Sequence, residues 1–419
     1  MCFLADKKSK SLNKRDIKEL REKNHGYHNI KLYILILIVI LINFGIVYYI
    51  YINKKELNDE IKIKMLKLEE KINLLENKMN SSKQNKNEEL IINNTEIQGE
   101  ELPEISYEKF DDNIFQEVKK QQMEFCNEQN KYINSQFEKQ IKLSKLSFLG
   151  NSYDMYVYKY KDFVSKNIAF HHSWETTETR RVINALKYFS SLKNIPNDNI
   201  YILDIGSNIG WYTMLLAKNG YQVLSFEPSI KNMYILRKNF CLNPNLNITL
   251  INRGLFTEEK KCNYYFNKIN IGNGMIQCDK NITVSNDLIK SGEVKLTKLR
   301  NYIEFLSTKS VALIKIDVEG SEGKAIESGI ELISKYHVPF IFAEFSPSAL
   351  KLHGTDPMQF LEMFEMNGYK FAKKHFLDNN YYTKQELMKK YKNNPTNLHI
   401  VYSNIIKSGE NNITNNSYL

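Results

Sequence analysis

Residues 200–210 read IYILDIGSNIG, and this stretch decides the fold. Its first six residues form a short apolar run, which predicts a buried strand. Gly206 and Gly210 follow, and residues 211–219 continue as a helix. Glycines at such a strand-to-helix turn let the main chain approach a ligand closely and adopt conformations closed to other residues. The stretch therefore predicts a ligand-binding loop at the end of the first strand.

Further short apolar runs follow this strand, and they alternate with amphipathic stretches. They cover residues 222–226, 248–251, 311–318 and 340–345. This alternation is typical of a parallel sheet wound with helices. Between residues 257 and 280 the pattern is polar and β-rich, and we interpret Gly272-Asn273-Gly274 as a turn. We expect an α/β, Rossmann-like domain with a doubly wound, mostly parallel sheet.

The spacing of the loop distinguishes two kinds of cofactor site. A dinucleotide fingerprint reads G-x-G-x-x-G, whereas this loop reads D-x-G-x-x-x-G, with Asp204 two residues before Gly206. A carboxylate at that place would repel a pyrophosphate and suit a cationic ligand. S-adenosylmethionine carries a sulfonium and an ammonium group, so it fits this charge. An NAD-dependent oxidoreductase would need a third glycine and a different loop length.

Glu227 and Pro228 end the second apolar run. A carboxylate at this place, about 20 residues after the loop, can accept hydrogen bonds from ribose hydroxyls. Pro228 then opens the next helix at a position that proline tolerates. A Glu-Pro pair alone is a common helix start. Combined with the spacing of the glycine loop, it favours the ribose-binding role.

Charged side chains interrupt the fourth and fifth apolar runs at Lys315, Asp317, Glu319 and Glu344. Residues two apart share one face of a strand, and three unpaired buried charges would be costly. We therefore expect them at the open carboxyl end of the sheet, where ligands bind. A salt bridge between Lys315 and Glu344 is the alternative for Glu344. The three carboxylates could also bind magnesium, but they include no histidine, and we predict no metal.

The segments LDIGSNIGWYT, SFEPS, KIDVEGSE and FAEFS together resemble the FkbM-type methyltransferases, a branch of the class I S-adenosylmethionine-dependent enzymes. The similarity extends from about residue 172 to about residue 370. It implies that the loop binds the methionine moiety, Glu227 binds the ribose, and Asp317 and Glu319 flank the transfer site. Glu175 is expected to help close the pocket, with an exposed carboxylate at a helix start as the alternative. The expected cofactor-binding residues are Glu175, Asp204, Gly206, Ser207, Asn208, Gly210, Glu227 and Pro228, with Lys315 and Glu344 in the pocket.

Family members act mostly on hydroxyl groups, often of sugars. The resemblance therefore implies O-methylation of a sugar or glycoconjugate, with a small molecule or a glycan as acceptor. A hydroxyl is a poor nucleophile, so a general base is expected within hydrogen-bond reach. Asp317 is the first candidate, followed by Glu319 and His172. The alternative is a catalytically inactive membrane protein that keeps the fold for assembly or interaction.

Residues 32–52 read LYILILIVILINFGIVYYIYI, without a charge. A helix needs about 20 apolar residues to cross a bilayer, so we predict a single transmembrane helix over residues 32–53. A secretory signal peptide would have a shorter apolar region and a cleavage site. The basic tail, residues 1–31, favours a cytoplasmic N-terminus. We expect a type II protein whose catalytic domain lies in a lumen of the endoplasmic reticulum or Golgi type.

Apolar residues recur at spacings of four and three within residues 54–80, which predicts a coiled-coil stalk and a homodimer. Amphipathic packing onto the enzyme is the alternative. The remaining segments are a polar linker (81–101), a helical or irregular lead-in segment (102–180), the methyltransferase domain (181–405) and a polar tail (406–419). N-glycosylation sequons begin at Asn80, Asn93, Asn247, Asn281, Asn412 and Asn415, and they have meaning only in a lumen.

The net charge of +10 could indicate an anionic partner. The basic residues are spread along the chain rather than gathered in a patch, so we predict no nucleic-acid partner. The five cysteines have no metal-site spacing and do not resemble a disulfide scaffold. A single bridge between Cys262 and Cys278 is conceivable in an oxidising lumen.

Overall fold

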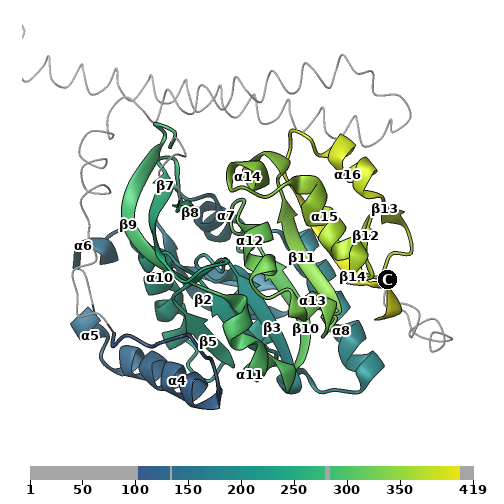
Figure 1. Ribbon diagram of the computed structural model, residues 1–419. Helices are drawn as coiled ribbons and strands as arrows, with labels where there is room; N and C mark the ends of the chain where they lie inside the picture. The colour runs from purple at the N-terminus through teal and green to yellow at the C-terminus, as the bar shows by residue number, and fades with distance from the viewer. Residues whose placement is uncertain (1–101, 133–134, 279–283, 406–419) are drawn as a thin grey trace, which may run out of the picture. The chain divides into compact units, whose positions relative to one another are not determined.

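The computed structural model describes residues 102–132, 135–278 and 284–405 (Figure 1). The chain divides into two units, residues 1–89 and 90–419, and the described residues all belong to the second. The predicted basic tail, membrane span, stalk, linker and C-terminal tail lie outside the described residues, so they stay predictions. Within the described ranges, no helix combines the length and the hydropathy that crossing a bilayer requires.

Five parallel strands form the centre of this unit. They are β3 (Ile200–Ile205), β4 (Gln222–Phe226), β5 (Ile248–Ile251), β10 (Ser310–Ile316) and β11 (Phe340–Phe345). They lie in the order β11-β10-β3-β4-β5, and each neighbouring pair is parallel. The apolar runs of the sequence are therefore the strands of the sheet, and the predicted α/β fold is confirmed.

Three antiparallel strands extend the sheet beyond β11, and the sequence patterns do not reveal them. They are β14 (Thr396–Tyr402), β12 (Tyr369–Ala372) and β13 (Tyr381–Tyr382). β14 pairs with β11, and β12 lies between β14 and β13. The complete sheet is thus mixed, with its parallel half next to the glycine loop.

Helices cover both faces of the sheet because its strands alternate between two hydrophobic cores. Ile202 and Leu203 are neighbours on β3, yet their side chains enter different clusters, as the two-residue period of a strand requires. The first cluster includes side chains of α8 (Thr176–Lys193), α9 (Trp211–Lys218) and α10 (Ile230–Cys241). The second includes side chains of η2 (Leu299–Tyr302), α11 (Ile303–Ser307), α12 (Glu322–Glu327), α13 (Glu331–Ser334), α14 (Pro347–Leu352), α15 (Pro357–Met366) and α16 (Lys384–Lys390). The doubly wound arrangement is confirmed.

The lead-in segment packs onto the sheet rather than standing apart from it. Its elements are α4 (Asp112–Asn127), α5 (Gln129–Tyr132), α6 (Ser135–Glu138), the antiparallel strands β1 (Ile141–Phe148) and β2 (Asn151–Tyr158), and α7 (Phe163–His171). The Gln122 side chain on α4 donates to the Ile248 carbonyl at 3.1 Å and accepts from the Leu250 N–H at 2.7 Å. These two bonds cover the outer edge of β5, which would otherwise offer unpaired main-chain groups.

A second, smaller sheet follows β5 in the chain. It contains β6 (Gly254–Leu255), β7 (Lys261–Asn267), β8 (Asn270–Gln277) and β9 (Leu288–Thr297), in the order β6-β9-β7-β8. The interpretation of residues 272–274 as a turn is wrong, because they lie inside β8. Glycine stands at 272 and 274 for reasons of space: a Cβ atom would overlap Asp162 at the first position and the Tyr264 ring at the second.

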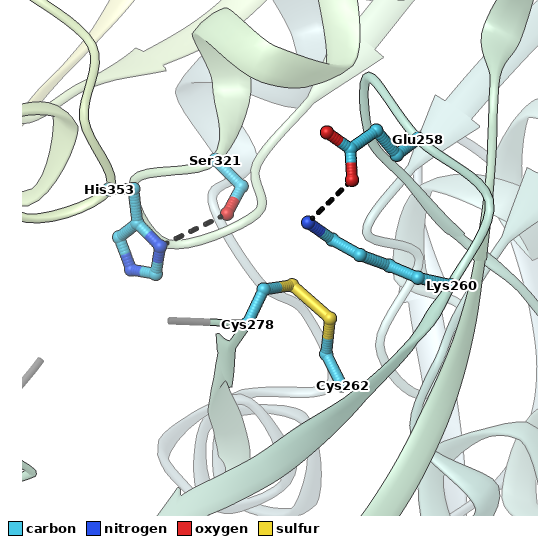
Figure 2. Close-up of a disulfide and its surroundings, with 6 residues drawn as sticks. All are labelled: Glu258, Lys260, Cys262, Cys278, Ser321 and His353. Carbon is cyan, nitrogen blue, oxygen red and sulfur yellow. Dashed lines mark hydrogen bonds and ion pairs between the residues drawn. A yellow bond between two sulfur atoms is a disulfide. The ribbon is translucent and has the colours of Figure 1, made fainter. Parts of the chain in front are cut away.

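Four of the five cysteines form disulfides, so the interpretation that they do not form a disulfide framework is wrong. Cys126 of α4 is bonded to Cys241 of α10, and Cys262 of β7 is bonded to Cys278 just after β8. Figure 2 shows the second bridge at one end of the β7–β8 hairpin, near the ion pair of Lys260 with Glu258. The first bridge joins residues separated by 115 positions, which sequence spacing does not reveal.

Candidate functional site

The glycine loop joins β3 to α9 at the carboxyl edge of the sheet. Gly206 and Gly210 have φ values of +77° and +97°, which favour glycine. A Cβ atom on Gly206 would overlap the main-chain oxygen of Asp317, and one on Gly210 would overlap the Leu236 side chain. The loop is also anchored to β4, because the Gly206 N–H donates to the Phe226 carbonyl at 2.9 Å. Close packing of main chains therefore fixes the loop.

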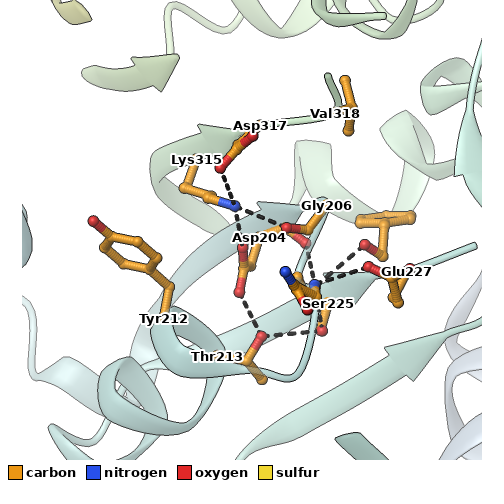
Figure 3. A network of polar contacts seen from close by, with 12 residues as sticks. Asp204, Gly206, Tyr212, Thr213, Ser225, Glu227, Lys315, Asp317 and Val318 are labelled. Carbon is orange, nitrogen blue, oxygen red and sulfur yellow. Dashed lines mark hydrogen bonds and ion pairs between the residues drawn. The ribbon is translucent and has the colours of Figure 1, made fainter. Parts of the chain in front are cut away.

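Asp204 lies beneath this loop and is fully buried. Its Oδ2 accepts a hydrogen bond of 2.5 Å from the Thr213 hydroxyl, which also contacts Ser225 (Figure 3). Its Oδ1 lies 3.6 Å from the Lys315 Nζ. Asp204 is not among the residues that line the pocket. Its predicted contact with the cofactor stays a prediction, and its burial beneath the loop gives it a supporting position.

Lys315 is the buried cation that links the loop to β10. Its Nζ donates to the Gly206 carbonyl at 2.8 Å and lies 3.8 Å from a carboxylate oxygen of Asp317 (Figure 3). Burial alone would lower the pKa of Lys315, but the nearby carboxylates of Asp317 and Asp204 outweigh it and raise that pKa. Lys315 therefore stays protonated and holds two carboxylates and the loop together. The structure does not form the alternative ion pair between Lys315 and Glu344, because Lys315 lies against Asp204 and Asp317.

Glu227 directly follows β4 and faces the loop. Its Oε2 accepts from the Asn208 N–H and its Oε1 from the Ser229 N–H, both at 2.8 Å. Burial raises the pKa of Glu227 to about 7, although these main-chain donors oppose the shift. Each carboxylate oxygen has two lone pairs, so the side chain can still accept from a ligand. Ser229 caps α10, which begins at Ile230, so Pro228 precedes the cap and does not open the helix as predicted.

Glu175 lies at the start of α8 but does not cap it through its side chain. Its Oε2 accepts from the Tyr212 hydroxyl at 2.8 Å, and its Oε1 lies 3.4 Å from the Asn397 side-chain nitrogen. Burial raises the pKa of Glu175, and the Asp317 carboxylate adds to the shift. Glu175 lines the pocket. The alternative of an exposed carboxylate at a helix start is therefore excluded.

The acidic segment follows β10, which ends at residue 316 rather than 318. Asp317 and Glu319 thus lie on the connection to α12 and not on the strand, and Glu319 has a φ of +56°. Carboxylate oxygens of Asp317, Glu319 and Glu344 all lie within 4.8 Å of one another. Burial raises the pKa of Glu344 to about 9, with further contributions from the Asp317 and Glu319 carboxylates. This geometry fits either a shared proton or a bound cation.

Glu322 holds this connection in place, and the sequence analysis did not single it out. Its Oε1 accepts from the N–H groups of Val318 and Gly320, at 2.9 and 3.2 Å. Burial raises the pKa of Glu322 to about 7. Within the KIDVEGSE segment, the last acidic residue therefore positions the two before it.

These elements surround one pocket at the carboxyl edge of the sheet. Nine of the residues selected from sequence line it: Glu175, Gly206, Ser207, Asn208, Glu227, Pro228, Lys315, Asp317 and Glu319. Gly210 and Glu344 are not among the lining residues. The lining also contains residues that sequence reasoning missed, chiefly Trp174, Asn232, Arg253, Tyr264, Gly272 and Gly274. Gly272 and Gly274, in the β-rich segment, are the sequence feature from which the β7–β8 side of the pocket could have been predicted.

His172 is not part of the pocket, which corrects its place among the candidate bases. It ends α7 in the left-handed conformation and is exposed. Its ring nitrogen Nδ1 lies 2.8 Å from the Lys145 carbonyl oxygen. The imidazole therefore contacts the β1–β2 hairpin.

A sequence model described as the methyltransferase FkbM domain matches residues 204–371. The resemblance is confirmed over these residues, and with it the enzyme class and S-adenosylmethionine as the cofactor of the family. No curated protein sequence matches the chain.

Similar solved structures include the bifunctional kinase-methyltransferase WbdD, with 11% identity, 53% of this chain and 38% of that chain covered, and a TM-score of 0.30. The T. thermophilus 16S rRNA N2 G1207 methyltransferase RsmC has 10% identity, 62% and 50% coverage, and a TM-score of 0.30. The Synechocystis PCC 6803 magnesium protoporphyrin IX methyltransferase ChlM has 12% identity, 57% and 84% coverage, and a TM-score of 0.29. The chain thus spans well under half of the WbdD chain. Similarity at these scores says nothing about the acceptor.

Proposed function

We propose that this chain, whose residues 204–371 match the methyltransferase FkbM domain, transfers a methyl group from S-adenosylmethionine to a hydroxyl of a sugar or glycoconjugate. The observation that carries the proposal is the charge of the pocket. Glu175, Glu227, Asp317 and Glu319 line it. Of the two cations on the same wall, Lys315 is bonded to the loop and lies near Asp204 and Asp317, and Arg253 is paired with Glu104.

The residues present fit S-adenosylmethionine. The buried Oδ1 of Asn208 has no hydrogen-bond partner, so a donor on the ligand could satisfy it. Carboxylates on the wall suit the sulfonium and ammonium charges through Coulomb attraction. The loop from Gly206 to Gly210 would hold the methionine moiety, and Glu227 would accept from the ribose hydroxyls. The cofactor, when bound, supplies the methyl group as an electrophile.

Asp317 is the proposed general base. Its side chain is 43% exposed, unlike the buried Asp204 and Lys315 on the same network. An acceptor hydroxyl can therefore reach its carboxylate, which would take the hydroxyl proton as the oxygen attacks. Lys315, 3.8 Å away, orients this carboxylate. Glu319 is the second candidate, on the same connection.

Glu175 and Tyr212 are proposed to position the acceptor side of the pocket. Their hydrogen bond joins the start of α8 to the first turn of α9. Trp174 adds an apolar surface beside them. Orienting the acceptor for in-line attack supplies much of the rate in such transfers, and excluding water protects the methyl donor.

The test uses the full chain with labelled methyl donor and separate glycan, lipid and protein acceptor fractions. We expect label in the glycan fraction, and Asp317→Asn should abolish it while cofactor binding persists. Base catalysis contributes about 10²–10⁴-fold, so a variant that keeps full turnover would rule out Asp317. Label confined to protein would contradict the sugar acceptor.

We also propose that the domain is held at a membrane by residues 32–53 and dimerises through residues 54–80, with the domain in a lumen. The disulfides Cys126–Cys241 and Cys262–Cys278 support an oxidising compartment, because such bonds are rare in the cytosol. Protease protection of the domain in sealed microsomes tests this orientation. Digestion without detergent would contradict it.

A further inference from the structure

Four large apolar side chains are exposed on the α7 helix, just before it, and at the turn of the β7–β8 hairpin. Tyr160, Phe163, Phe170 and Ile269 have exposed fractions of 56%, 50%, 70% and 67%. Isolated exposed apolar residues need no explanation. These four come from two segments that the structure joins, so we define them as the α7–β8 surface.

Two hydrogen bonds join the segments. The Phe163 N–H donates to the Asn270 side chain at 3.0 Å, and the Ile271 N–H donates to the Lys161 carbonyl at 2.6 Å. Figure 1 shows α7 beside β8 accordingly. Phe163 and Phe170 are seven residues apart, so they lie on one face of α7, while Ser165 and Ile168 are buried. Ile269 is thereby held close to the N-terminal end of that face.

Lysines surround the apolar residues: Lys159, Lys166 and Lys268 are exposed, and Lys161 is half-buried. Asp162 adds no charge outside, because it is buried and caps α7 through the Ser165 N–H. Asp287 is an exposed acidic residue next to the hairpin turn. Its main-chain carbonyl accepts a hydrogen bond from the Lys268 N–H. Aromatic and aliphatic side chains bordered by lysines are the chemistry of a membrane-water interface.

We propose that the α7–β8 surface docks peripherally on a bilayer that contains anionic phospholipids. The lysines complement anionic headgroups in the leaflet that faces the domain, and the four apolar side chains enter the interfacial layer. This docking does not rest on the lumenal orientation proposed above. Val164 of α7 and Gly272 of β8 line the pocket, so the surface borders the site. Docking would bring the pocket next to the bilayer and favour an acceptor that the membrane itself holds. This last consequence rests on the proposed function, whereas the docking does not.

The test places an environment-sensitive fluorophore on the full chain in nanodiscs. Cys2→Ser removes the remaining cysteine, and Phe170→Cys supplies the labelling site. We expect the emission to shift to shorter wavelength and to be quenched by brominated lipid when the disc contains phosphatidylserine. Met366→Cys is the matched control, because Met366 is 79% exposed on α15, and its label should stay unquenched.

The charge contribution is tested with Lys166→Glu combined with Lys268→Glu, which should remove the shift at position 170. Equal behaviour of the labels at 170 and 366 would overturn the proposal. A shift that follows protein concentration but not lipid composition would also overturn it, in favour of contact between two copies. S-adenosylmethionine binding is measured on the same samples. Loss of that binding would contradict the proposed function without affecting the docking proposal.

Discussion

At the scale of single residues, the two oxygens of Glu227 each accept from a main-chain N–H group. In Glu227→Gln, one oxygen becomes an NH₂ group that faces a donor, so one buried N–H loses its partner. An unsatisfied buried donor costs about 1–3 kcal/mol. We expect Glu227→Gln to lose about that much free energy of unfolding and to bind S-adenosylhomocysteine at least tenfold more weakly. Denaturant titration and calorimetry check both values, and unchanged binding would contradict the ribose role.

Glu344 allows a test of whether the acidic cluster holds a proton or a metal ion. Its pKa is raised from 4.5 to about 9, so the neutral form predominates at pH 7. A raised pKa in the folded state stabilises the protein below pH 4.5, and this contribution is lost as the pH rises toward 9. Glu344→Gln mimics the neutral form and should remove that pH dependence of the free energy of unfolding.

We also expect Glu344→Gln to keep its methyltransferase activity, and a chelator to leave the activity of the unmodified chain unchanged. Glu108→Gln, which alters an exposed carboxylate, is the control for both measurements. Loss of activity in Glu344→Gln, together with dependence on added magnesium, would contradict the shared proton and support a metal site.

The sequence predicts the acidic residues and most of the glycine loop on the pocket wall, but neither the rest of the lining nor how deeply each side chain is buried. Glu227 and Asp317 come at strand ends, and strand ends in a parallel sheet meet at one edge. Asp204 is also at a strand end, yet Thr213 and Lys315 enclose it. His172 was selected for its chemistry, and only the end of α7 decides where its ring points. Such differences arise from packing between distant segments.

At the scale of elements, the Cys262–Cys278 bridge closes the β7–β8 hairpin whose residues Tyr264, Gly272 and Gly274 line the pocket. A disulfide that closes a loop of this length stabilises the folded protein by about 3 kcal/mol, because it lowers the conformational entropy of the unfolded chain. Cys262→Ser combined with Cys278→Ser should lower the free energy of unfolding by about that amount and weaken cofactor binding. Hydrogen exchange along residues 261–277 locates the change. Unaltered exchange there would contradict a supporting role for the bridge.

Strands with apolar runs could be predicted almost to the residue, as β4 and β5 show. The β1–β2 hairpin replaces part of a segment that was expected to be helical or irregular. Its signal was available, because Tyr153, Met155 and Val157 alternate with less buried residues along β2. The turn predicted at Gly272 and Gly274 is absent for a physical reason. Glycine is typical of turns, but here it makes room for Asp162 and Tyr264 inside a strand.

At the scale of the whole molecule, the fold gathers residues from three regions of the chain into one acidic pocket. Glu175 precedes β3, Glu227 follows β4, and Asp317 follows β10. The family match and the pocket agree on methyl transfer, while the membrane anchor rests on residues outside the described ranges. The 115-residue separation of Cys126 and Cys241 likewise shows why distant pairings escape prediction from sequence.

Calorimetric titration of the full chain with S-adenosylmethionine tests the central claim most directly. We predict saturable binding to the unmodified chain and its loss in Gly206→Ala, whose Cβ atom would overlap the Asp317 main chain. Gly150→Ala is the control, because Gly150 has a similar φ of +79° but no atom within 4 Å of the added Cβ. Gly150→Ala should still bind S-adenosylmethionine. Absence of binding by the folded, unmodified chain would contradict the account.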